Sequence, residues 1–432
     1  MTFSRRTFLT GTAALAGSTG LAGLLGVSPS FAVAPAKDVT ATLTTYNWGN
    51  PDEAKAYGAA FDRFKSIYPN VGVTDNIVPV SSWSDYADKL VTQIAGGNPP
   101  DIINIAIEGL RLSVSKGLLL PLDDLINGDP EIKALVDQLP AQLKEGLTVD
   151  GKLYEIPNGT QTMVIHYNTK IFKDAGLEPP KPDWTWDDFL ATAKKLTTGS
   201  GDSKVYGFGM PWFNFAFHPW WLTNGTYPVT DDYAHSNLNN PKMIEAAKFV
   251  HSLVHEHGVS PDPIGLNVYD QFAAGKFAMT AAGRWPVTGW VKGGFTDFDI
   301  VLWPKKETQT TVFGEGGWGI SPQSKNPDLA LQAIKTLISM QTVKELTDIG
   351  QQIPMYAEVA KDPDFLAVPK SAPLFFKALT TARAVAAPAY FNSVDRITQR
   401  AMDTMIGNAD PKGVEDVLNG AHQELEGEIA SS

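Results

Sequence analysis

The stretch that decides the fold is Asp101-Ile-Ile-Asn-Ile-Ala-Ile107, a nearly continuous apolar run. Such runs are typical of strands that helices cover on both faces. Upstream of this run, residues 86–94 and 53–68 place apolar side chains at helical spacing, whereas residues 71–80 and 40–46 are rich in β-branched residues. The resulting β-α-β-α-β order predicts a parallel, doubly wound α/β sheet.

Ligands of such sheets lie in the crevice beyond the carboxyl ends of the strands. The loops at 47–51, 81–84 and 106–109 occupy that position, and we expect them to face a ligand. A second region rich in strand and helix patterns begins near residues 163–168. Since 432 residues exceed what one hydrophobic core usually serves, we expect two lobes.

Composition restricts the classes of function. Hydrophobic residues make up 43% of the chain and charged residues 19%, which is typical of a folded protein. The formal net charge of −12 argues against nucleic acid or an anionic membrane as a partner. The chain has no cysteine, which excludes disulfides, thiolate catalysis, cysteine-based zinc sites and a lipid-modified cysteine anchor.

The first 32 residues resemble an export signal. Ser4-Arg-Arg-Thr-Phe-Leu9 precedes an apolar stretch at 12–27 that is rich in Ala, Gly and Leu, and small residues follow at Ser30 and Ala32. This pattern predicts a twin-arginine signal peptide over 1–32, cleavage near Ala32 and a periplasmic location. The alternative is an uncleaved anchor, for which the stretch is short and rich in glycine.

Two motifs resemble a dinucleotide-binding site and a zinc site, but a structural role explains each of them better. Gly314-Glu-Gly-Gly-Trp-Gly319 has the spacing of a dinucleotide-binding motif, but Ile-Ser-Pro322 follows where a helix should begin, so we expect a turn that approaches a ligand. His251, His255 and His257 lie near the C-terminus of a predicted helix, and the first two share a face that could bind zinc. Because no third ligand converges on these two, we expect the histidines to stabilise the negative end of the helix instead. We therefore expect no metal and no cofactor.

Aromatic residues are abundant in segments that we predict to be loops. Indole and phenyl rings stack on the apolar faces of sugar rings, while nearby amide, carboxyl and guanidinium groups bind hydroxyls. Packing in the core is the alternative for each ring taken singly. The residues are Trp48, Trp83, Trp212, Phe213, Phe215, Trp220, Trp221, Trp285 and Trp318.

Several runs together resemble the extracellular sugar-binding proteins of ABC importers, the family that includes maltose-binding protein. They follow the family's order and spacing over nearly the whole chain after residue 32. They include Gly97-Asn-Pro-Pro-Asp101, Gly117-Leu-Leu-Leu-Pro-Leu122, Asp150-Gly-Lys-Leu-Tyr-Glu-Ile-Pro157, Phe172-Lys-Asp-Ala-Gly-Leu177, Thr185-Trp-Asp-Asp-Phe189, Phe272-Ala-Ala-Gly-Lys-Phe-Ala-Met-Thr280, Gly283-Arg-Trp285 and Gly316-Gly-Trp-Gly-Ile-Ser321.

The resemblance implies a periplasmic-binding-protein-like fold of type II, with two doubly wound α/β lobes joined by three crossings. The crossings are expected near 159–163, 302–305 and 338–345. The N-terminal lobe would then comprise 33–159 and 305–340, and the C-terminal lobe 163–302 and 345–432.

The resemblance also implies a ligand site between the lobes. The first lobe would contribute an aromatic and polar loop together with Glu108, whose carboxylate would bind sugar hydroxyls. Because Ile105 and Ala106 stand where relatives often have an aromatic residue, stacking in this lobe would rest on Trp48 or Trp83. The expected site residues are Trp48, Asn50, Trp83, Glu108, Gln161, Trp212, Phe215, Arg284, Trp285, Gly317 and Trp318.

The function implied is a monomeric binding protein that captures a sugar and delivers it to the permease subunits of an ABC importer. A secreted carbohydrate-active enzyme is the alternative, but it needs two carboxyls roughly 5 to 9.5 Å apart, and Glu108 has no obvious partner in the sequence. A zinc-binding protein is a third possibility. The sequence does not identify the sugar.

Overall fold

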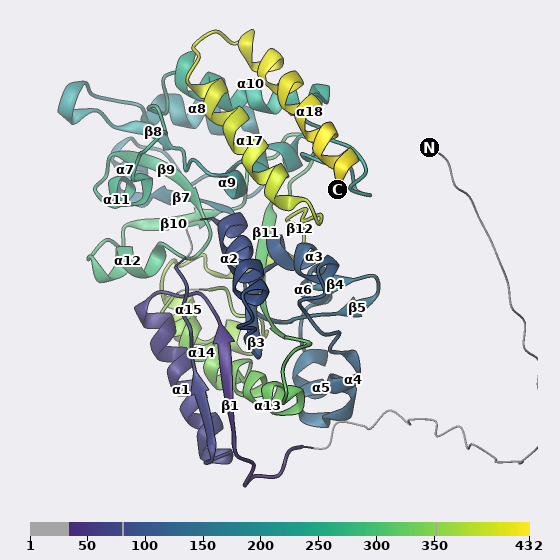
Figure 1. The fold of residues 1–432 in the computed structure, drawn as a ribbon. Helices are drawn as coiled ribbons and strands as arrows, with labels where there is room; N and C mark the ends of the chain where they lie inside the picture. Colours follow the sequence, from purple (N-terminus) through teal and green to yellow (C-terminus); the bar gives the residue numbers. More distant parts are fainter. Residues whose placement is uncertain (1–33, 80–81, 351) are drawn as a thin grey trace, which may run out of the picture.

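The computed structural model describes residues 34–79, 82–350 and 352–432, and it consists of two α/β units (Figure 1). The unit built on the sheet that contains β1 is called the N-lobe, and the unit built on the sheet that contains β7 is called the C-lobe. The expected signal peptide, 1–32, lies outside the described residues. Among the helices of the described residues, none combines the length and hydrophobicity that a membrane crossing requires.

The N-lobe sheet confirms the predicted parallel core. Its strand order is β12-β11-β3-β1-β2, and β6 also pairs with β11. The β1 strand runs parallel to both β2 and β3, whereas β11 is antiparallel to β3 and β6. All five residues of β3 are buried, as the apolar run predicts. The strands are β1 (Ala41–Tyr46), β2 (Val71–Thr74), β3 (Ile102–Ala106), β6 (Ile156–Thr162), β11 (Val312–Ile320) and β12 (Arg383–Ala384), and a separate hairpin joins β4 (Thr148–Val149) to β5 (Lys152–Leu153).

Helices pack around this sheet and its edges. The α1 helix begins at a capping box, in which Asn50 accepts from the backbone N–H groups of Asp52 and Glu53 while Glu53 accepts from the N–H of Asn50. Its buried face includes Tyr57 and Phe64. The helices are α1 (Pro51–Ile67), α2 (Trp83–Ala95), α3 (Ile107–Ser115), α4 (Asp123–Gly128), α5 (Pro130–Asp137), α6 (Ala141–Gly146), α13 (Pro327–Leu337) and α14 (Met340–Asp348).

The C-lobe has a four-stranded sheet in the order β10-β7-β9-β8. Its strands are β7 (Val164–Asn168), β8 (Tyr206–Gly209), β9 (Phe277–Ala282) and β10 (Phe298–Val301). Its helices are α7 (Thr169–Asp174), α8 (Trp186–Leu196), α9 (Asn214–Thr223), α10 (Pro241–His255), α11 (Val268–Ala273), α12 (Val287–Lys292), α17 (Phe391–Ile406) and α18 (Gly413–Ser431). Two short helices, α15 (Pro363–Ala367) and α16 (Pro373–Leu379), lie on the segment that returns from the N-lobe.

The chain passes between the two sheets three times. The first passage is at Met163, between β6 and β7, and the second spans 302–311, between β10 and β11. After β11, α14 packs on α1 and α13, and β12 still pairs with β11. Phe365 of α15 and Phe375 of α16 share a core cluster with Val164 of β7 and Ile300 of β10, so the third passage lies after α14, further along the chain than the expected 338–345. The reason is that α14 buries Val343 and Leu346 within the N-lobe, which an amphipathic pattern alone does not specify.

The aromatic core of the C-lobe surrounds α9, a helix that is buried on all sides. Trp220 and Trp221 are each 1% exposed. The Trp220 ring contacts the rings of Trp186 and Trp303, at centroid distances of 5.5 and 4.9 Å. These tryptophans of the predicted loops are thus core residues.

Candidate functional site

The strand β11 runs between the two lobes and brings aromatic residues of both onto one of its faces. A Cβ atom at Gly316 would overlap the Trp48 ring, and a Cβ atom at Gly314 would lie 3.0 Å from Cε2 of Phe215. Glycine is therefore needed for both rings to lie directly on the strand. The glycine-rich motif that we expected to form a turn is instead a strand, because it pairs with β3 and β6 along its length.

Gly317 points to the opposite face of β11. A Cβ atom there would lie 2.6 Å from Cβ of Glu155 and 2.7 Å from Cδ1 of Leu147. The next residue, Trp318, is fully buried and packs edge-on against Tyr57 of α1, with ring centroids 5.3 Å apart. Neither residue is placed to contact a ligand between the lobes, because Gly317 faces Glu155 and Leu147 and the Trp318 ring is buried against Tyr57.

The N-lobe contributes an aromatic group made of Trp48, Trp83 and Tyr86. The Trp48 and Trp83 rings meet edge-on at 4.9 Å, and Trp48 meets Tyr86 at 5.8 Å. The Tyr86 hydroxyl donates to the backbone oxygen of Asn104 on β3, at 2.8 Å, which anchors the group to the sheet. Trp48 and Trp83 are half-buried and are the candidates for stacking. Asn50, by contrast, uses its side-chain oxygen to cap α1.

The C-lobe contributes a second aromatic group around Trp285. The Trp285 ring lies 6.2 Å from Phe215 and 6.3 Å from both Phe213 and Tyr269, measured between centroids. Phe213 is 36% exposed, which is unusual for a phenylalanine and places an apolar ring at the surface beside Trp285. Phe215 joins this group to β11 through Gly314.

Gln161 at the end of β6 connects the first passage to the Trp285 loop. Its Oε1 accepts from the backbone N–H of Arg284 at 2.8 Å. The Arg284 side chain turns away from the aromatic groups, since its guanidinium carbon lies 4.5 Å from the ring centroid of Phe365 on α15. Arg284 is 3% exposed, and burial lowers its pKa to about 10. Its guanidinium packs on α15, and its Nε and Nη1 atoms are buried without a hydrogen-bond partner among the described residues.

Trp212 is also directed elsewhere. Its indole N–H donates to Oδ1 of Asp403 on α17 at 2.7 Å, and its ring packs on Phe217 at 4.7 Å. We expected the whole segment from Trp212 to Phe215 to face a ligand. Of its aromatic residues, only Phe213 and Phe215 lie in the group around Trp285.

A polar cluster of Ser84, Asn214 and Asp395 draws on both lobes, and Glu108 lies near it. Asp395 on α17 accepts from Nδ2 of Asn214 on α9 at 2.6 Å and from Oγ of Ser84 on α2 at 3.3 Å. Glu108, in the first turn of α3, is 5% exposed, and burial raises its pKa to about 8, with a smaller contribution from Asp395. Burial also raises the pKa of Asp395.

Sequence reasoning identified Glu108 but no member of this cluster. Asp395 lies in an amphipathic helix, where a lone acid normally belongs to the solvated face. The sequence signal that could have identified Asp395 was its position between the apolar residues Val394 and Ile397, both of which are buried in the structure.

Direct contacts join the lobes on two sides of this region, called the lobe junction. On one side, Asp88 of α2 accepts from Nη2 of Arg396 at 2.7 Å and from Nδ2 of Asn392 at 2.8 Å. On the other, Nζ of Lys292 at the end of α12 contacts Oδ2 of Asp52 on α1 at 2.7 Å. Both ion pairs are exposed, and such pairs contribute roughly 0 to 1 kcal/mol each, so they oppose separation of the lobes only weakly.

Two cavities lie outside the aromatic groups. One of about 900 Å³ is lined by Tyr227 and Asp231 of the C-lobe and by Arg383 of β12, among others. The other, of about 230 Å³, lies beside α3 and is lined by residues that include Ile107 and Tyr233. None of the eleven expected site residues lines either cavity.

The histidines noted in the sequence have structural partners. Nε2 of His251 donates to the backbone oxygen of Asn408 at 2.7 Å, and Nε2 of His255 donates to that of Ile406 at 2.8 Å. These bonds join α10 to the end of α17. The arrangement does not favour zinc, because both Nε2 atoms are already committed to carbonyl groups.

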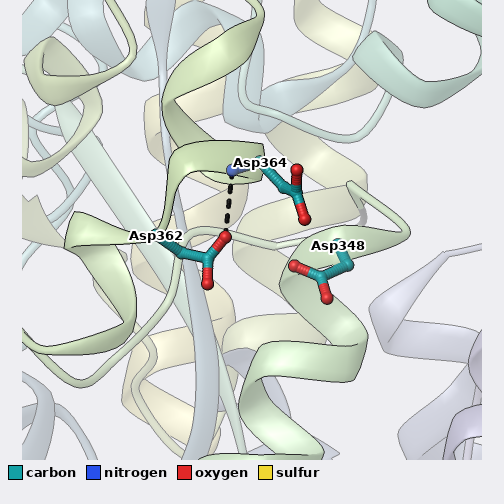
Figure 2. A group of neighbouring side chains, drawn as sticks. All are labelled: Asp348, Asp362 and Asp364. Carbon is teal, nitrogen blue, oxygen red and sulfur yellow. Dashed lines mark hydrogen bonds between the residues drawn. The ribbon is translucent and has the colours of Figure 1, made fainter.

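Three carboxylates, those of Asp348, Asp362 and Asp364, have oxygen atoms within 4.8 Å of one another (Figure 2). Nζ of Lys344 lies 2.9 Å from Oδ2 of Asp348 and 2.7 Å from Oδ2 of Asp362. Hydrogen bonds to these two carboxylates raise the pKa of Lys344, which keeps it protonated. Lys344 therefore joins α14 to the start of α15 through ion pairs with these carboxylates.

Comparisons with known proteins agree with this architecture. The family model of the bacterial extracellular solute-binding proteins matches residues 56–376. A Brucella abortus relative is 27% identical over 256 residues, which are 57% of this chain and 58% of that protein, so the match spans less than two thirds of the relative. The maltotriose-binding protein of Pyrococcus abyssi is 23% identical over 327 residues, which are 73% of this chain and 67% of that protein.

Among solved structures, an ABC substrate-binding protein of Listeria monocytogenes in complex with cycloalternan superimposes with a TM-score of 0.81. The superposition covers 91% of this chain and 100% of that one, at 24% identity, and so establishes the fold. Since the family model covers most of the described residues, the chain belongs to the bacterial extracellular solute-binding proteins.

Proposed function

We propose that this protein is the substrate-binding component of an ABC importer and holds a sugar between its lobes. The observation that carries the proposal is the meeting of two aromatic groups, one from each lobe, on Gly314 and Gly316 of β11. Aromatic rings on both sides of a ligand suit the apolar faces of a pyranose, while the polar cluster suits its hydroxyls. The relatives named for maltotriose and cycloalternan support the same class of ligand.

We further propose that binding is coupled to opening and closing of the lobes, with the three passages as the hinge. The described structure holds the lobes in contact through Asp88 and Lys292, so a ligand reaches the aromatic groups only when these contacts separate. The permease subunits of the importer would release the ligand by holding the lobes apart. Capture of this kind transforms nothing, so the protein is proposed not to be an enzyme.

The test is a thermal-shift and calorimetry screen over mono-, di- and oligosaccharides and polyols. We expect one ligand per monomer, and a sugar at 100 times its Kd should add about 2.7 kcal/mol to the free energy of unfolding. X-ray scattering with the same sugar should show a smaller radius of gyration. No shift with any sugar, or turnover of a glycoside into products, would sink the proposal.

We also propose that the chain is exported to the periplasm by the twin-arginine route. Replacing Arg5 and Arg6 together with lysine should leave the precursor in the cytoplasm, because the route recognises the arginine pair. Cell fractionation and immunoblotting measure the outcome, and Lys37→Arg serves as a control outside the signal. Normal export of the double variant would show that another route is used.

A further inference from the structure

The larger of the two cavities lies at the C-terminal end of α9, away from the two aromatic groups. Phe215 is in the first turn of this helix, whereas Leu222, which lines the cavity, is about 10 Å further along its axis. We call it the α9 cavity, and its lining comes from the segments 222–240, 308–310 and 381–383. Its volume of about 900 Å³ is within the range of about 300 to 1,000 Å³ that small-molecule sites occupy.

The wall at the end of α9 is fixed by a Schellman motif. The backbone N–H of Gly225 donates to the oxygen of Leu222 at 3.0 Å, which is one of the two bonds of this motif. The other runs from the N–H of Thr226 to the oxygen of Trp221, also at 3.0 Å. Gly225 has a φ of 72°, a left-handed conformation that glycine adopts at low cost. Thr226 is therefore held at the cavity wall before any ligand binds.

The second passage forms another part of the wall and is held by hydrogen bonds as well. The N–H groups of Glu307 and Thr308 both donate to the backbone oxygen of Thr223, at 2.9 and 3.1 Å. Oγ1 of Thr310 donates to the backbone oxygen of Thr381 at 2.6 Å. A cavity whose walls are ordered in advance loses little conformational entropy when a ligand fills it.

The two acids and the arginine that line the α9 cavity are already engaged. Arg383 forms an ion pair with Asp231. Asp232 accepts from Oγ1 of Thr230 at 2.6 Å and from the backbone N–H of Ala234 at 3.0 Å. Because these charges are compensated, the groups left to recognise a ligand are chiefly the neutral threonine and amide side chains of the lining.

One of these neutral groups, the hydroxyl of Thr226, has an unmet hydrogen bond. Thr226 is 8% exposed, and its Oγ1 is buried without a hydrogen-bond partner among the described residues. A buried polar group in this state costs stability unless another molecule bonds to it. Since a hydroxyl both donates and accepts, a hydroxyl of a ligand can satisfy it in either direction.

We propose that the α9 cavity is a second binding site, separate from the region between the aromatic groups, and that it takes a small polyol. Thr226 supplies the central hydrogen bond, and the other threonine and amide groups of the lining bind the remaining hydroxyls. The site goes beyond the proposed function, because none of the residues of the two aromatic groups contributes to it.

The experiment titrates the full chain with three polyols, sorbitol, myo-inositol and sucrose, and follows binding by ligand-observed NMR. Hexanediol is the apolar match, since it has the carbon chain of sorbitol without most of its hydroxyls. We expect saturable binding of at least one polyol, and hexanediol should bind at least about tenfold more weakly than that polyol. Failure of all three polyols to saturate, or equal binding of hexanediol, would overturn the inference.

Thr226→Val assigns the binding to this cavity, because it keeps the shape of the side chain and removes only the hydroxyl. Affinity for the best polyol should fall about tenfold, while the midpoint of thermal unfolding should not fall, since no hydrogen bond within the described residues is lost. Thr398→Val is the matched control, because Thr398 on α17 also buries an unpartnered hydroxyl but does not line the cavity. If Thr226→Val binds the polyol like the parent, or if both variants weaken it equally, the inference is wrong.

Trp285→Ala separates this site from the one between the aromatic groups. Polyol binding in the α9 cavity should be unchanged in this variant. A polyol whose affinity falls in Trp285→Ala but not in Thr226→Val lies between the aromatic groups, which refutes the second site and leaves the proposed function intact. Conversely, polyol binding that only Thr226→Val weakens, together with a saccharide screen that finds no other ligand, supports the second site and contradicts the proposed function.

Discussion

Replacing Trp285 with alanine should weaken sugar binding about thirtyfold or more, which corresponds to about 2 kcal/mol. The ring is held in place before any ligand arrives, by contacts with Phe213, Phe215 and Tyr269 and by the bond from Arg284 N–H to Gln161. A rigid aromatic anchor loses little entropy on binding, so its removal is costly. Calorimetry with the sugar that gives the largest thermal shift is the measurement.

Trp285→Phe is the companion variant, because a phenyl ring retains an apolar face for stacking. It should keep most of the affinity that alanine loses. Thermal unfolding of both variants checks that the C-lobe still folds. If alanine binds as tightly as tryptophan while folding normally, the aromatic group around Trp285 is not the ligand platform.

Replacing Trp220 with alanine should lower the free energy of unfolding by about 3 to 5 kcal/mol, the largest effect on stability that we predict. The side chain is 1% exposed, and its ring contacts those of Trp186, Phe189 and Trp303. Removing an indole from such a cluster leaves a cavity that neighbouring helices cannot fill.

Denaturant unfolding followed by tryptophan fluorescence and circular dichroism measures this change. Trp220→Phe, which leaves a smaller cavity, should lose less than half as much stability. A Trp220→Ala protein within about 1 kcal/mol of the parent would mean that α9 rearranges to refill the space.

Local sequence patterns predicted the strands and the parallel sheet of the N-lobe well, because hydrophobic periodicity is a property of short segments. The apolar run at 101–107 corresponds to the buried strand β3, and the N-lobe sheet has the predicted parallel core. The third passage was placed too early because α14 is amphipathic, and the sequence does not state which lobe its apolar face meets.

The site was predicted less completely, since its residues meet only through the tertiary fold. Trp318 and Trp285 both lie in motifs that contain glycine, yet the Trp318 ring is fully buried against Tyr57 of α1. Arg284 was also expected in the site, but its side chain points away from the Trp285 loop and packs on Phe365. Asp395 and Asn214 are 181 residues apart and are brought together by α17.

The late position of α17 in the chain bears on how the protein is made. A ribosome that has reached residue 390 has already produced β1, β3, β11 and the whole C-lobe sheet, but not Asp395 or Arg396. Until α17 emerges, the C-lobe is incomplete and lacks Asp395 and Arg396, two of the side chains that bridge it to the N-lobe. The ability to bind sugar should therefore arise only near the end of synthesis, so it reports on completed folding rather than assisting the early steps.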